Sequence, residues 1–175
     1  TEDGGYVLAG NLDSMIFLVK TDQFGDTSWT KTYGREGINK GNYVLQDSSG
    51  GYIIAGSTTG YGDNEMVYLV KTNANGDTVW TNKYTDEVDC WSTCIQHTCD
   101  GGYVITGGSG SFFHDILLMR INSDGDTIWV KHISGDGTTE QADYVQQTDD
   151  GGYIIVGKQV PYGGGPPMYE IYLVK

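Results

Sequence analysis

An internal repeat of about fifty residues is the feature that most constrains what this chain can fold into. A Gly-Gly-Tyr motif followed by apolar residues occurs four times, beginning at Gly4, Gly50, Gly101 and Gly151. A run of apolar residues ends in a basic residue at Lys20, Lys71, Arg120 and Lys175. A Gly-Asp-Thr-x-Trp motif begins at Gly25, Gly76 and Gly125. Because the motifs keep one order, residues 1–175 are predicted to form a single repeat domain with approximate units 1–41, 42–92, 93–142 and 143–175, the first and last incomplete.

One full copy of the repeat contains four short segments with the character of β-strands. We expect strands at 43–46, 52–55, 66–71 and 78–84, and the first of these has counterparts at 94–97 and 144–147. The second and third strands are apolar at consecutive positions, which indicates that both of their faces are covered. The fourth alternates polar and apolar residues, as an outer edge strand does. Each copy is therefore predicted to be a four-stranded antiparallel meander.

The predicted fold class is all-β, and the predicted architecture is a β-propeller whose blades are these meanders. A β-solenoid is less suitable because its coils are usually shorter than fifty residues, and a β-sandwich has no reason to repeat. The strands make about three and a half to four blades, whereas closed propellers have about four to eight. The chain is then a piece of a longer array, a four-bladed ring with incomplete terminal blades, or a ring completed by a second chain.

Charge and hydropathy exclude several classes of partner. The formal net charge of −13 argues against binding of nucleic acid or of an anionic membrane surface, since both reward clustered Lys and Arg. No apolar run approaches the roughly 20 residues of a membrane-spanning helix. We therefore expect no nucleic-acid partner and no membrane insertion. The partners left open are a protein or glycan ligand, self-association, and further repeats of the same chain.

The turns between the predicted strands are rich in glycine and in acidic or amide residues. The stretch Asn122–Gly125 is predicted to be a type I turn that closes on a left-handed glycine. Asp124 and Asp126 also suggest a calcium site, but calcium takes about six to eight oxygen ligands and each turn offers few. We predict that turn formation explains these residues, with no metal ligand and no cofactor.

The repeat resembles a family of bacterial and archaeal repeat proteins, mostly secreted or displayed at the cell surface. The resemblance lies in Gly51–Gly56 (GYIIAG), Leu18–Asp22 (LVKTD) and Trp29–Gly34 (WTKTYG), and it covers nearly the whole chain. It implies a propeller-like fold and an extracellular or cell-surface location. It carries no catalytic residues to transfer to this chain. In the third copy, His132–Ser134 replaces Thr-Tyr-Gly.

The connections that differ between copies are the candidate binding surface. In a meander, alternate turns lie at one end of the sheet, so the variable connections should gather at the end opposite the constant turns. They hold aromatic residues that do not recur, near carboxylates, which would suit a sugar or a peptide. The candidate binding residues are Tyr61, Asp63, Asp89, Trp91, Phe112, Phe113, His114, Asp115, Tyr162 and Tyr169. The recurring tyrosines and tryptophans are instead predicted to pack between copies.

Three cysteines, Cys90, Cys94 and Cys99, lie close together in sequence, around the predicted strand at 94–97. In an extended strand Cys90 and Cys94 would be about 13 Å apart, which is too far for a disulfide. Cys94 and Cys99 could meet if the turn between them folds back. A zinc site with His97 lacks the usual paired spacing. Free buried thiols, a local disulfide and a metal site thus remain as alternatives.

No catalytic motif is present in the sequence. There is no Gly-x-Ser-x-Gly elbow, phosphate-binding loop or His-Glu-x-x-His. We therefore expect no catalytic residues and a protein that is not an enzyme. The predicted function is binding or adhesion by an extracellular repeat segment through its variable loops. The alternatives are a building block that self-assembles through blade edges into a layer or filament and, third, a hydrolase or lyase domain.

Overall fold

The computed structural model describes residues 1–60, 64–85, 88–111, 114–135, 138–161, 165–166 and 168–174. These residues form β-strands and turns, with no helix among them, which confirms the all-β fold class. The chain divides into two compact units, Thr1–Thr85 and Asp86–Lys175. Among the residues described, no helix is long and apolar enough to cross a membrane.

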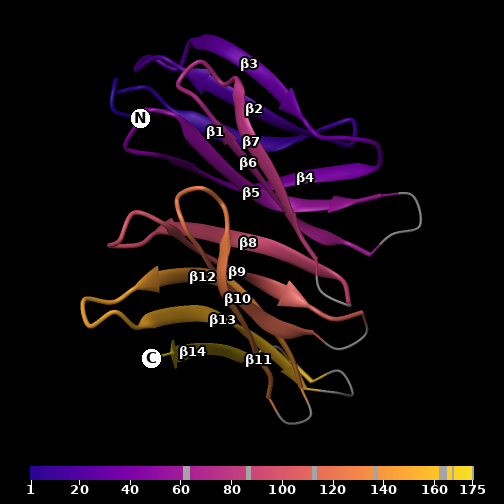
Figure 1. The fold of residues 1–175 in the computed structure, drawn as a ribbon. Coiled ribbons are helices and arrows are strands. Elements are labelled where there is room, and N and C mark those ends of the chain that lie inside the picture. The colour runs from indigo at the N-terminus through magenta and orange to yellow at the C-terminus, as the bar shows by residue number, and fades with distance from the viewer. Residues whose placement is uncertain are drawn as a thin grey trace. The chain divides into compact units, whose positions relative to one another are not determined.

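The first unit contains two antiparallel sheets in which each strand pairs with its neighbour in sequence (Figure 1). One sheet has the order β1-β2-β3 and the other β4-β5-β6-β7. The strands are β1 (Val7–Leu12), β2 (Met15–Thr21), β3 (Thr27–Tyr33), β4 (Ile38–Gln46), β5 (Tyr52–Thr59), β6 (Met66–Thr72) and β7 (Thr78–Tyr84). The predicted meander is therefore confirmed.

The second unit repeats this plan with the three-stranded sheet last. Its sheets have the orders β8-β9-β10-β11 and β12-β13-β14. The strands are β8 (Cys90–His97), β9 (Tyr103–Ser109), β10 (Asp115–Ile121), β11 (Thr127–Ile133), β12 (Thr138–Gln147), β13 (Tyr153–Pro161) and β14 (Met168–Val174).

The first strand of the second, third and fourth copies is longer than the sequence pattern predicts. It begins at Ile38, Cys90 and Thr138 rather than at residues 43, 94 and 144. A register shift interrupts each of these strands, between Gly41 and Tyr43 in β4 and at the matching places in β8 and β12. The shift breaks the period-two alternation, so the polar half of each strand resembles a loop in sequence. As a result, Trp91 and Glu140 lie in strands rather than in the predicted connections.

The predicted turn chemistry is also observed. The glycines Gly25, Gly76 and Gly125 have φ values of 90°, 78° and 90°, a region in which most residues with a Cβ are strained. In the turn after β10, Asn122 Oδ1 accepts hydrogen bonds from the backbone N–H groups of Asp124 and Asp126. The side chain of Asn122 thus closes the turn for which calcium was considered.

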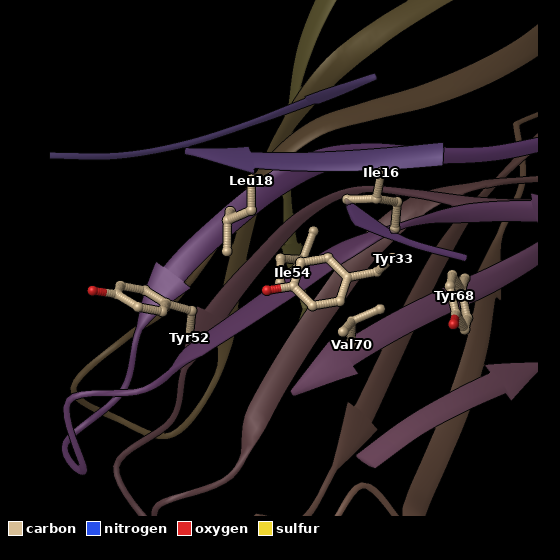
Figure 2. Close-up of a cluster of buried hydrophobic side chains, with 7 residues drawn as sticks. All are labelled: Ile16, Leu18, Tyr33, Tyr52, Ile54, Tyr68 and Val70. Atoms are coloured by element: carbon tan, nitrogen blue, oxygen red, sulfur yellow. The ribbon is translucent and has the colours of Figure 1, made fainter. Parts of the chain in front are cut away.

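The core of the first unit lies between its two sheets. One side of β2 and β3 contributes Ile16, Leu18 and Tyr33, and β5 and β6 contribute the opposing layer. Figure 2 shows the buried side chains that form this core between the two sheets: Ile16, Leu18, Tyr33, Tyr52, Ile54, Tyr68 and Val70. The Tyr33 hydroxyl donates a hydrogen bond of 2.7 Å to the Gly76 carbonyl. Burial, with a contribution from the Asp77 charge, raises the pKa of Tyr33 to about 12.

Candidate functional site

The constant turns, at the end of each sheet that we call the constant end, hold a basic side chain against a carboxylate. Lys20 pairs with Asp3, Lys71 with Asp47 and Arg120 with Asp100. Lys20 and Arg120 also donate to backbone carbonyls of their own strands, Thr21 O and Ile121 O. The basic residue that recurs in the sequence is therefore a structural group that fastens the third strand to the turn before the second. Lys175 lies outside the described residues.

The carboxylate changes place between copies without changing its role. In the second copy Asp47 accepts a hydrogen bond from the Ser49 hydroxyl. In the third copy the two residue types have exchanged positions, and Asp100 accepts a hydrogen bond from the Thr98 hydroxyl. Burial raises the pKa of Asp47, but hydrogen bonds from Lys71 and Ser49 outweigh it and the pKa is lowered. The hydrogen bond from Thr98 likewise lowers the pKa of Asp100. Two sequence patterns, Asp-x-Ser and Thr-x-Asp, thus build the same ion pair.

Two pairs of recurring aromatic residues pack between neighbouring sheets, one pair in each unit. Trp29 meets Tyr52 edge to face with ring centroids 5.8 Å apart, and Trp129 meets Tyr153 in the same way at 5.7 Å. Gly76 lies against the Trp29 ring, where a Cβ would approach the ring to 2.9 Å. These contacts bear out the structural role predicted for these four recurring aromatics, whereas Tyr6, at the same repeat position as Tyr52, is 59% exposed.

Recurring glutamines join the sheets at the same end. Gln46 Oε1 accepts the Glu2 backbone N–H at 2.9 Å, and Gln147 Oε1 accepts the Cys99 backbone N–H at 2.8 Å. A hollow of about 420 Å³ lies beside Gln147 and His97, and one of about 280 Å³ beside Gln46. Because the linings are repeat positions with structural contacts, the constant end is best explained as scaffold.

The variable end of the second unit brings together two of the predicted binding residues. Trp91 on β8 and His114, just before β10, meet edge to face with ring centroids 4.8 Å apart and interplanar angle 83°. Both side chains are half-buried. Trp91 stands opposite Gly108 on β9, and a Cβ at Gly108 would overlap the indole ring. In the second copy, Lys40 stands at the position of Trp91 and Ser57 at that of Gly108. The aromatic pair is therefore a feature of the third copy that the second copy lacks.

Two of the predicted carboxylates lie close in sequence to this aromatic pair, one just before β8 and one at the start of β10. The Asp89 carbonyl, next to the first residue of β8, accepts the Gly110 backbone N–H at 2.8 Å. Asp115 opens β10 opposite Ser109, and Ser109 is also opposite Cys90. Asp89 and Asp115 are half-buried. The structure therefore places Asp89, Trp91, His114 and Asp115 at one end of one sheet.

The remaining predicted binding residues cannot be placed at this site. Five of them fall outside the described residues: Tyr61, Asp63, Phe112, Phe113 and Tyr162. The backbone of Tyr169 lies in β14 opposite Lys158, and its side chain falls outside the described part of the structure. Their assignment stays a prediction.

Glu140 is a residue at this end that the sequence did not single out. Its backbone N–H donates to His114 O at 2.7 Å, joining β12 to the residue just before β10 that belongs to the aromatic pair. The side chain is 1% exposed; its Oε1 accepts hydrogen bonds from Thr138 and Gln159. Oε2 is buried without a hydrogen-bond partner among the described residues. The register of the repeat could have identified this position, because it matches Asn39 in the second copy.

Asn39 shows what this position requires. Its backbone N–H donates to Ser14 O at 2.9 Å, as that of Glu140 does to His114 O. Its amide Nδ2 donates to the carbonyls of Arg35 and Ser14, while Oδ1 accepts from the Thr58 hydroxyl. A carboxylate has no donor to offer, so the acid at position 140 is a costly choice for stability. A buried carboxylate oxygen without a partner among the described residues calls for an explanation.

This comparison leads to the first testable expectation. Glu140→Gln should raise the free energy of unfolding by about 1 kcal/mol, because an amide can donate where Oε2 cannot. The mirror change Asn39→Asp should lower it by about 2 kcal/mol, since it puts an unpaired charge against carbonyls. Urea unfolding of both variants is the measurement. Changes of the same sign in the two variants would contradict the assigned hydrogen-bonding pattern.

Ser109 and the cysteines are further reactive side chains on or near β8 and β9. Ser109 Oγ lies 2.8 Å from His132 Nδ1, but Ser109 is buried, which hides it from a substrate. Cys90, Cys94 and Cys99 are free thiols, the first two buried and the third exposed. Of the alternatives for these cysteines, free thiols are thus the observed state, with Cys99 differing from the predicted burial. Among the described residues no group of three or more His, Cys, Asp or Glu side chains is placed to hold a metal.

Comparisons with known proteins give a likeness of fold. The endo-arabinase from Bacteroides thetaiotaomicron VPI-5482 superposes with a TM-score of 0.60. The match has 15% sequence identity and covers 99% of this chain and 72% of the other. No protein-family model matches the chain, and no curated protein does.

The expectation that the protein is not an enzyme is contradicted by this comparison, because the similar structure is an enzyme. The prediction relied on the absence of short catalytic motifs. Glycoside hydrolysis needs no such motif, since a pair of carboxylates brought together from distant strands suffices. Absence of motifs was therefore weak ground for excluding catalysis.

Proposed function

We propose that the protein is a β-propeller-type repeat protein that binds a polysaccharide at the variable end of its second unit. The observation that carries this proposal is the half-buried pair of Trp91 and His114, flanked by Asp89 and Asp115. Recurring antiparallel meanders and the likeness to an arabinase support the architecture. An extracellular or cell-surface location remains a prediction.

The chemistry of this end suits a sugar. An indole ring offers an apolar surface with one polar N–H, which matches the apolar face and polar rim of a pyranose or furanose ring. Carboxylates accept strong hydrogen bonds from hydroxyl groups. The net charge of −13 repels anionic polymers, so a neutral polysaccharide is the ligand class that fits.

Hydrolysis of a glycoside is the second candidate. Two half-buried carboxylates, Asp89 and Asp115, lie at the variable end of the second unit. Retaining and inverting glycosidases both act through two carboxyl groups. The similar structure is that of an endo-arabinase, so arabinan is the first substrate to examine.

Affinity electrophoresis in gels containing arabinan, with cellulose-derived and pectic polymers in parallel gels, tests the binding proposal. Trp91→Ala should weaken retardation at least tenfold, as expected from the loss of roughly 1.4 kcal/mol or more of stacking. Phe24→Ala is the matched control, because Phe24 is an exposed aromatic in a turn at the constant end of the first unit. Equal retardation of both variants, or none of the wild type, would overturn the proposal.

Release of reducing ends from arabinan separates the second candidate from simple binding. If the protein hydrolyses the polymer, Asp89→Asn and Asp115→Asn should each reduce the rate at least a hundredfold while retardation in the gel remains. A wild-type protein that is retarded but releases no reducing ends leaves binding as the function.

A further inference from the structure

The first sheet presents an apolar face that the other sheets of the repeat bury. On β1 Leu8 is 54% exposed, and just before this strand Tyr6 is 59% exposed. The matching residues of the next copy, Tyr52 and Ile54, are 2% and 0% exposed. On β2, Phe17 and Val19 are half-buried, whereas their counterparts on β6, Tyr68 and Val70, are buried. We call Tyr6, Leu8, Phe17 and Val19 the leading face.

The last sheet presents a second apolar surface on its described strands. Tyr144 on β12 and Val156 on β13 stand opposite each other and are 38% and 41% exposed. In the copy before, the same two register positions hold Cys94 and Thr106, both 0% exposed. We call Tyr144, Val156 and the half-buried Ile154 the trailing face.

The first unit shows how two such faces fit together. There, Val7 and Ala9 on β1 pack with Ile16 and Leu18 against the layer formed by Tyr52, Ile54, Tyr68 and Val70. The residues of the leading face match that layer one copy earlier. Ile154 and Val156 occupy the same positions after the Gly-Gly-Tyr motif as Val7 and Ala9 do. The leading and trailing faces are thus the two halves of an interface that already occurs inside the molecule.

We propose that a second copy of this chain docks its trailing face on the leading face, so that copies associate head to tail. The two faces differ, which makes the contact heterologous, and heterologous contacts build rings or filaments rather than closed pairs. The free edge of β1, which pairs only with β2 among the described strands, lies in the same sheet as the leading face. The net charge of −13 opposes association, so salt should strengthen it.

Sedimentation velocity measures the association directly. Wild-type protein should exceed the monomer mass of 19.1 kDa as its concentration rises, and more so in high salt. Leu8→Glu blocks the leading face and Val156→Glu the trailing face, and each variant alone should sediment as a monomer. Both positions are exposed, so each variant should fold. Val79→Glu, at an exposed position of β7 in a sheet that carries neither face, should associate as the wild type does.

Mixing the two blocked variants distinguishes head-to-tail pairing from any symmetric contact. Leu8→Glu retains a trailing face and Val156→Glu a leading face, so an equimolar mixture should give a dimer of twice 19.1 kDa and nothing larger. A wild type that stays monomeric in high salt, single variants that still associate, or a mixture that stays monomeric would each overturn the proposal. Should Leu8→Glu lose its strand signal in circular dichroism, Tyr6→Lys tests the same face.

Discussion

Lys71→Met should lower the free energy of unfolding by about 3 kcal/mol, the cost of leaving a buried charge without its partner. The Lys71 and Asp47 side chains are 14% and 6% exposed, which makes this ion pair the most buried of those described. Lys31→Met is the matched control. It breaks the pair between Lys31 and Asp77, whose side chains are 39% and 59% exposed, and should cost less than about 1 kcal/mol. Urea unfolding of both variants gives the comparison.

The exchanged positions of the acid and the hydroxyl residue in the second and third copies allow a second test of this ion pair. Asp47→Thr alone removes the carboxylate and should be destabilising. Adding Ser49→Asp recreates the arrangement of Thr98 and Asp100, with the acid two residues later. The double variant should recover most of the loss. A double variant less stable than Asp47→Thr would show that the two turn patterns are not equivalent.

The same pair predicts a pH dependence. The folded-state pKa of Asp47 is lowered, so its stabilisation is fully present above the unfolded value of about 3.9 and is lost as pH falls through the folded value. The wild-type advantage over Lys71→Met should therefore be constant near neutrality and shrink in acid below about pH 4. A difference in unfolding free energy that stays the same down to pH 2 would contradict this assignment.

The repeat made the strands and the scaffold predictable, because three motifs recur at positions where backbone and packing demands recur. Gly76 and Trp29 could be assigned structural roles from recurrence, and both are found in contact between sheets. The long first strands were not predictable, since the register shift at Gly41 and Tyr43 hides their period. The candidate site predicted from the sequence also lacked Glu140. This residue becomes distinctive only when its hydrogen bonds are compared with those of Asn39.

Residues at the same position of the repeat need not contribute equally to the free energy of unfolding, and the recurring tyrosines Tyr6 and Tyr52 allow the difference to be measured. Tyr52→Ala should lower the free energy of unfolding by about 3 to 5 kcal/mol, because it removes a large buried ring and leaves a cavity. Tyr52 is 2% exposed and meets Trp29 edge to face. Tyr6→Ala, at the same position of the first copy, should change it by less than about 0.5 kcal/mol, since Tyr6 is 59% exposed.

Urea unfolding at low protein concentration makes this comparison, because there the leading face is not covered by a second copy. Tyr52→Phe is the control that keeps the ring, and it should cost less than about 1.5 kcal/mol. Equal losses for Tyr6→Ala and Tyr52→Ala in dilute protein would mean that the leading face is already covered within one chain. A small loss for Tyr6→Ala that grows as the protein is concentrated is the result expected if a second copy supplies the missing layer, because binding to the folded state stabilises it by mass action.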